Sequence, residues 1–208
     1  MINLYDNLLK KYGKQGWWPL YNKISGKFEY FAGNPKNERQ KLEICLGAIL
    51  TQGTNWKNVE KALLNLTKNN LIDKNKLNKI SLKKLSLLIK SSGYYKQKAR
   101  KIKEFIKFLN SEKEITRENL LDIWGIGPET ADSILLYAYN KPYFVIDAYT
   151  KRIFSRLGYC KEDIKYEELQ NLITNKIPKD VDLYKEFHAL LVKHGKNLFK
   201  DGQRVLNK

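Results

Sequence analysis

The stretch Leu120 to Gly158, LLDIWGIGPETADSILLYAYNKPYFVIDAYTKRIFSRLG, decides the fold of this chain. Its pattern predicts a helix, a tight glycine turn, a second helix, an extended link and a third helix. Gly125 and Gly127 flank Ile126 in a turn that needs positive φ or a close backbone approach, which a Cβ would obstruct. Pro128 follows where a helix begins at no cost, because its missing N–H would have no partner there. The sequence therefore predicts two helices joined by a short hairpin.

The predicted hairpin leaves several backbone amides pointing outward at the start of its second helix. Such a helix N-terminus binds anions, and a DNA phosphate is an anion. The alternative is an ordinary hairpin between two packed helices, because glycine turns are common. The hairpin residues expected to contact a DNA backbone are Gly125, Ile126, Gly127 and Thr130.

Asp147 is the candidate catalytic residue. It follows a short apolar run, Tyr143 to Ile146, and stands just ahead of the third helix. As an N-cap it would stabilise that helix by about 1 kcal/mol. The capping role and a catalytic role are compatible, because a capping geometry also holds an acid rigidly.

The helix, the GIGPETA hairpin, the second helix and the following VIDAYTKR resemble the signature of the helix-hairpin-helix DNA glycosylases related to endonuclease III. The resemblance spans nearly the whole chain and is closest to the endonuclease III-like 3-methyladenine glycosylases. It implies that the hairpin grips the phosphate backbone and that Asp147 stabilises positive charge on the deoxyribose or activates water. The lysine with which bifunctional members attack the sugar falls at Glu129. We therefore expect a monofunctional enzyme, which releases a base without cutting the strand.

The same resemblance implies roles for four residues nearer the N-terminus. Gln52 matches a glutamine that enters the DNA stack after the target nucleotide has left, and a loop hydrogen bond is the alternative. Trp56 aligns with an aromatic residue that stacks on the extruded base. Trp17 and Trp18 resemble a Trp-Trp-Pro element at the base pocket, with core packing as the alternative. Such rings suit a cationic alkylated purine, because an aromatic face attracts positive charge.

Several charged residues are weaker candidates. Lys96 and Lys98 lie in a region that resembles the turn before a helix running beside the DNA, and we expect them to contact phosphates. Lys196 matches a lysine close to the base pocket, with exposed C-terminal charge as the alternative. Glu129 is expected to contact the base or simply to favour a helix N-terminus. Because family members hold potassium or sodium at the hairpin, a candidate cation site is formed by the backbone carbonyls of Leu121, Ile123 and Ile126.

The charge of the chain points to nucleic acid. Its 208 residues carry a formal net charge of +17, spread over lysine-rich helices and not gathered in a tail. This predicts a field that attracts DNA, with a membrane-surface or generally cationic protein as the alternative. No apolar run approaches the roughly 20 residues of a membrane span, and no signal-peptide pattern is present. We expect a cytoplasmic, nucleoid-associated monomer that binds double-stranded DNA containing a damaged base.

Neither the cysteines nor the histidines predict a cofactor. Cys45 and Cys160 are too few for an iron–sulfur cluster, which takes four ligands, and no cysteine follows Phe199. The spacing of His188 and His194 does not place them on one helical face, and no cysteine or histidine cluster accompanies them. We therefore expect no cofactor, no iron–sulfur cluster and no transition metal.

The resulting expectation is an all-α protein of two helical domains with a DNA-binding cleft between them. Residues 38–140 would form a six-helix domain containing the helix-hairpin-helix, and residues 1–37 with 141–208 a second helical domain. The expected activity is base excision of an alkylated purine, 3-methyladenine or 7-methylguanine. A uracil, thymine-mismatch or 8-oxoguanine glycosylase is the alternative, and a noncatalytic helix-hairpin-helix DNA-binding protein is the alternative of another class.

Overall fold

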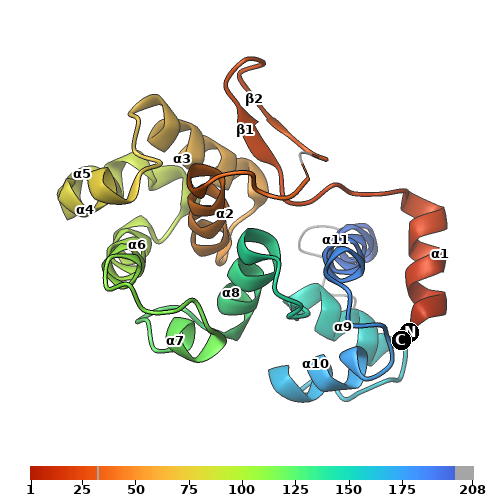
Figure 1. Ribbon diagram of the computed structural model, residues 1–208. Coiled ribbons are helices and arrows are strands. Elements are labelled where there is room, and N and C mark those ends of the chain that lie inside the picture. The colour runs from red at the N-terminus through yellow and green to blue at the C-terminus, as the bar shows by residue number, and fades with distance from the viewer. Residues whose placement is uncertain (32, 200–208) are drawn as a thin grey trace. The chain divides into compact units, whose positions relative to one another are not determined.

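The computed structural model describes residues 1–31 and 33–199, and this part of the chain is almost entirely helical (Figure 1). The predicted all-α class is confirmed, since the only strands among the described residues are two of three residues each. The chain divides into two compact units. We call residues 18–140 the hairpin unit, and residues 1–17 with those from 141 onwards the Asp147 unit. None of the helices among the described residues is long and apolar enough to cross a membrane.

The hairpin unit contains most of the elements. Its strands are β1 (Leu20–Asn22) and β2 (Lys27–Glu29), and its α-helices are α2 (Glu38–Thr51), α3 (Trp56–Lys68), α4 (Lys74–Lys79), α5 (Leu82–Leu88), α6 (Tyr95–Leu109), α7 (Arg117–Leu121) and α8 (Pro128–Ser133). A 3-10 turn, η1 (Lys90–Ser92), precedes α6, and a π-helical turn, η2 (Ile134–Ala138), continues α8.

Helix α2 is the core of the hairpin unit. Every residue from Leu42 to Leu50 is buried, and the helix packs against α3, α6, α8 and η2. Asn37 caps its first turn by accepting a hydrogen bond from the Gln40 amide. The burial includes Glu43, whose carboxylate lies 3.2 Å from the Arg39 guanidinium. Because α2 has no exposed face along this run, its end at Gln52 is held in place from several sides.

Residues 18–37 belong to the hairpin unit, whereas the sequence analysis assigned them to the other domain. Strands β1 and β2 form an antiparallel hairpin that pairs Tyr21 with Phe28. The Tyr21 amide donates a 2.6 Å hydrogen bond to the buried Glu43 carboxylate. Trp18 packs so closely on Gly47 that a Cβ there would lie 2.8 Å from the indole ring. These contacts with α2 explain why the segment joins this unit.

The Asp147 unit consists of α1 (Ile2–Tyr12), α9 (Ala148–Arg156), α10 (Tyr166–Thr174) and α11 (Val181–Leu198). Helix α11 packs against both α1 and α9. Its core contains an aromatic cluster in which the Phe144 ring lies 5.4 Å from Tyr184 and 5.6 Å from Phe187. The extended run before α9 is buried at Phe144, Val145 and Ile146, so the position of Asp147 follows from this packing.

Candidate DNA-binding hairpin and active-site carboxylate

The predicted hairpin is present between α7 and α8. Gly125 has φ +83°, and a Cβ there would lie 2.7 Å from the aliphatic stem of Lys101, so this position needs glycine twice over. Gly127 is different, because its backbone is extended and a Cβ would meet nothing within 4 Å. Pro128 begins α8 as expected. The amides in the first turn of α8 have no acceptor within the helix, which leaves them available to an anion.

A buried ion pair braces the two helices of the hairpin. The Arg117 guanidinium on α7 donates through Nε to Asp132 Oδ1 on α8 at 2.8 Å, and its second nitrogen lies 3.5 Å from Oδ2. Asp132 is fully buried. A planar two-point contact of this kind fixes orientation as well as distance. The pair therefore sets how α7 and α8 cross.

Gln52 lies against this hairpin, at the end of α2. Its Nε2 donates to the Thr130 hydroxyl at 2.8 Å and to the Gly125 carbonyl oxygen at 3.3 Å. The Lys101 ammonium donates to its Oε1. In this structure Gln52 therefore has the alternative role expected from the sequence, which is to form hydrogen bonds with nearby loop residues. It can enter a DNA stack only after releasing these partners.

The structure contradicts the phosphate contact predicted for Lys98 and limits the one predicted for Thr130 to its backbone. Lys98 is wrong as a DNA-contacting residue, because it is only 2% exposed and its ammonium donates to the carbonyl oxygens of Leu50 and Ser92 at 2.9 and 2.5 Å. Burial, with a smaller contribution from the neighbouring positive charge of Lys101, lowers the pKa of Lys98 to about 8. Thr130 is also buried, and its hydroxyl already accepts from Gln52. Any phosphate contact by Thr130 is therefore left to its backbone amide.

Other hairpin predictions remain open. Lys96 is exposed, as a phosphate contact requires. The Ile126 side chain is buried and its amide donates to the Ile123 carbonyl at 3.0 Å, so this part of the turn is closed internally. The cation site at the three hairpin carbonyls is not tested by these contacts and stays a prediction. Among the described residues, no three His, Cys, Asp or Glu side chains are grouped as a metal site requires.

Three residues in α6 or just before it lie against the hairpin or the turn after α2, and none of them is among the predicted site residues. Lys101 covers Gly125 with its stem, and the Arg100 guanidinium lies 4.1 Å from the centre of the Trp124 ring. Tyr94, just before α6, is 72% exposed with φ +45° and reaches the turn at Gly53. The only signal in the sequence was the lysine-rich and arginine-rich pattern, which does not tell a buried contact from a solvated one.

Trp18 and Trp56 come together in the hairpin unit. Their rings meet edge to face with centres 5.3 Å apart, and Trp18 also lies 5.3 Å from Tyr137. Both tryptophans are more than nine-tenths buried, and the Trp56 indole N–H donates to Glu60 Oε1 at 2.9 Å. Core packing therefore accounts for most of their surface. Trp17 belongs to the Asp147 unit and is half-buried.

Asp147 caps α9, as the sequence predicted. Its Oδ1 accepts from the Thr150 amide at 2.7 Å and from the Thr150 hydroxyl at 2.8 Å. Its Oδ2 lies outside the cap, 4.0 Å from His188 Nε2 on α11, and its side chain is 14% exposed. Burial lowers the pKa of His188, and the Asp147 carboxylate opposes this shift. The helix cap therefore fixes one oxygen of the Asp147 carboxylate, and the other oxygen points outside the cap. The neighbouring His188 imidazole is neutral.

The remaining predicted residues lie on exposed surfaces. Glu129 is exposed in the first turn of α8, where an acid is favourable in any case. Lys196 is exposed in the last turn of α11, which fits its alternative as a C-terminal charge. His194 is half-buried, and its Nδ1 lies 2.8 Å from the Tyr12 hydroxyl.

The sequence of this chain matches the model of a known protein family. The family model described as the HhH-GPD superfamily base excision DNA repair protein matches residues 46–179, which include the hairpin, Gln52 and Asp147. The chain belongs to this superfamily. Its HhH-GPD region thus covers elements from both units, and the protein is a DNA glycosylase of base excision repair.

Related proteins and a solved structure match this HhH-GPD protein over most of its length. It is 42% identical to a putative DNA repair glycosylase of Methanocaldococcus jannaschii, over 94% of this chain and 87% of that one. It is 29% identical to endonuclease III of Thermotoga maritima, over 80% and 79% of the two chains. The crystal structure of the H. pylori 3-methyladenine DNA glycosylase bound to 1,N6-ethenoadenine matches with a TM-score of 0.75 and 29% identity, covering 95% of this chain and 96% of that one.

Proposed function

We propose that this HhH-GPD protein is a monofunctional DNA N-glycosylase that removes alkylated purines such as 3-methyladenine and 7-methylguanine, with Asp147 as its catalytic carboxylate. The observation that carries the proposal is the arrangement of the two carboxylate oxygens of Asp147. Thr150 holds Oδ1 in the helix cap, and Oδ2 lies outside the cap. An acid so fixed keeps its position when positive charge develops next to it.

The chemistry begins with extrusion of the nucleotide, because a base inside a duplex cannot be reached. Extrusion costs a few kcal/mol and least for a damaged base. Gln52 would exchange its bonds to Thr130 and Lys101 for contacts within the vacated stack. As the glycosidic bond breaks, the sugar becomes cationic. A carboxylate about 4 Å away stabilises it by roughly 4 kcal/mol at an effective dielectric constant near 20.

Two further features support the finer assignments. Glu129 stands where the bifunctional relatives carry a lysine, and a carboxylate cannot form the Schiff base that cuts the strand. The alkylated-purine assignment is supported by the match to a 3-methyladenine glycosylase. An alkylated purine already carries positive charge, so it leaves without strong acid catalysis.

A panel of duplexes, each with a single lesion, tests the substrate. The panel contains 7-methylguanine, 1,N6-ethenoadenine, uracil, thymine opposite guanine and 8-oxoguanine, with methylated DNA as the source of 3-methyladenine. We expect release of methylated purines and intact strands until alkali is added. Release of uracil but not of methylated purines would reject the substrate assignment, and borohydride trapping of a covalent adduct would reject monofunctionality.

The variant Asp147→Asn tests the catalytic role. Asparagine caps helices as well as aspartate does, so the contacts with Thr150 and the stability of the fold are expected to persist. Loss of roughly 4 kcal/mol predicts base release about a thousandfold slower, with DNA binding retained. The matched control is Asp163→Asn, at an exposed turn position, which is expected to leave base release unchanged. If Asp147→Asn binds DNA and releases bases at the normal rate, Asp147 is not the catalytic acid. If the wild type binds DNA but releases no base from any duplex of the panel, the chain is a noncatalytic DNA-binding module.

A further inference from the structure

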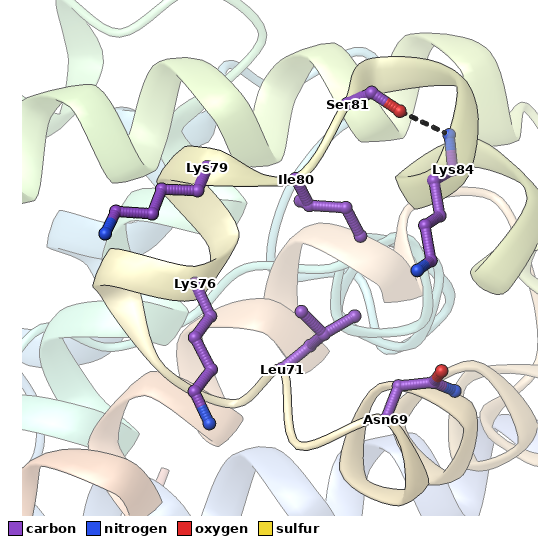
Figure 2. A pocket seen from close by; sticks show the side chains of 7 residues that line it. All are labelled: Asn69, Leu71, Lys76, Lys79, Ile80, Ser81 and Lys84. Carbon is purple, nitrogen blue, oxygen red and sulfur yellow. Dashed lines mark hydrogen bonds between the residues drawn. The ribbon is translucent and has the colours of Figure 1, made fainter.

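A concave site lies in the hairpin unit, where the end of α3, helix α4 and the start of α5 meet. It is a hollow of about 340 Å³ with the side chains of Leu71 and Ile80 at its floor (Figure 2). This volume falls within the usual range for binding sites, which begins at about 300 Å³. Its rim is formed by Lys76, Lys79 and Lys84, with Asn69 and Ser81.

The three rim lysines carry unneutralised charge. All three are exposed, and within the described part of the chain none of their ammonium groups makes an ion pair or a hydrogen bond. The nearest acid along the chain, Asp73, caps α4 by accepting from the Lys76 amide. Three uncompensated cations around one hollow make a site for an anion.

Helix α5, which supplies Lys84 to the rim, also carries two exposed leucines. On α5, Leu82 is 47% exposed and Leu87 is 60% exposed, although leucine is normally a core residue. The side chains of Leu71 and Ile80 in the hollow give an apolar side chain of a ligand a surface to cover.

The hollow faces away from the hairpin. On α6, Lys101 contacts Gln52 and Gly125, whereas Lys103 donates to the carbonyl oxygens of Leu77 and Asn78 at the end of α4, at 2.8 and 2.7 Å. Two residues apart on a helix is a rotation of about 200°, so these lysines point to opposite sides. Figure 1 shows α6 between α4 and α7 accordingly. The hollow therefore stays accessible when the hairpin holds a phosphate.

We propose that this lysine-rimmed hollow is a docking site for an acidic segment of a partner protein, with an apolar side chain of that segment on Leu71 and Ile80 and its carboxylates on the three lysines. A peptide with an apolar residue between acidic ones presents both chemistries within a few residues. The site is separate from the proposed catalytic chemistry and does not depend on it.

The test uses the full-length protein and a fluorescein-labelled peptide in which a central phenylalanine is flanked by aspartates and glutamates. Fluorescence anisotropy measures its affinity for the wild type and for the triple variant K76S/K79S/K84S. We expect the triple substitution to weaken binding about tenfold, since each exposed ion pair contributes modestly. Replacing the phenylalanine of the peptide by alanine is expected to weaken binding to the wild type about fivefold or more.

The matched control is K161S/K176S/K179S, which removes the same charge from exposed positions of the Asp147 unit. It is expected to weaken peptide binding by no more than about twofold, because none of these three lysines lines the hollow. Equal weakening by both triple variants would reduce the effect to general attraction and overturn the proposal. So would equal binding of the phenylalanine and alanine peptides.

A lesion-free DNA duplex is the competing ligand. If it displaces the peptide, and if K76S/K79S/K84S lowers its affinity more than the control triple variant does, the hollow is a nucleic-acid contact and the peptide proposal fails. Thermal unfolding checks that each variant is folded, and the three single lysine variants provide the same comparison if the triple variant is not.

Discussion

Removal of the Asp132 carboxylate should destabilise the hairpin unit more than any surface change. Breaking a buried ion pair by removing one partner costs about 3–5 kcal/mol. Arg117 keeps a 17% exposed side chain, so water can partly solvate it, and alanine is a better helix former than aspartate. Both effects place Asp132→Ala near the lower end, at about 3 kcal/mol.

Urea unfolding followed by tryptophan fluorescence measures this loss. Glu162→Ala, at an exposed turn, is the control and is expected to change the free energy of unfolding by less than about 0.5 kcal/mol. The double variant Arg117→Met with Asp132→Leu is expected to recover much of the lost stability, because it removes both charges together. Since the pair also sets how α7 and α8 cross, Asp132→Ala should weaken binding to an undamaged duplex. A loss of stability below about 1 kcal/mol would show that the pair does not brace the hairpin.

Three other perturbations have defined outcomes. Gly125→Ala should lower the free energy of unfolding by about 1–2 kcal/mol because of the positive φ at this position. Contact of the added Cβ with the Lys101 stem should lower it further. An unchanged melting temperature in calorimetry would contradict this prediction. Burial lowers the pKa of both His188 and His194, so the unfolded chain binds protons first as the pH falls below about 6.5. Stability should therefore decrease on acidification, less steeply in His188→Gln, and equal slopes in urea titrations would contradict this. Because burial lowers the pKa of Lys98 to about 8, the unfolded chain holds this proton to higher pH, and stability should rise above about pH 8 in the wild type but not in Lys98→Met.

The helices and the hairpin could be predicted because their signals are local. A glycine needed for positive φ at Gly125, a proline that starts a helix at Pro128 and a capping acid at Asp147 each act on their own few residues. Hydrophobic periodicity supplied the helices between them, and the structure has them. The predictions that differ from the structure concern segments whose position depends on residues far away in the sequence. The place of residues 18–37 depends on how Trp18 fits over Gly47 and on a buried glutamate that needs a donor.

The site was predictable only in part for the same reason. Lys98 looks in sequence like any other lysine of a charged helix, and only the fold puts its ammonium group between two backbone carbonyls. His188 is forty-one positions after Asp147, and the sequence analysis considered it only as a metal ligand. Its approach to within 4.0 Å of that carboxylate comes from the packing of α11 on α9. Periodicity reports which residues are buried and does not report which partners they meet.

The complete burial of α2 between Leu42 and Leu50 has a consequence for motion. A helix without a solvated side cannot fray along its middle, so its amide protons should exchange with deuterium only when the whole hairpin unit opens. Gln52 comes two residues after this protected run, at the point where protection should end. The side chain proposed to enter DNA can thus exchange its bonds to Thr130 and Lys101 while the helix before it hardly fluctuates.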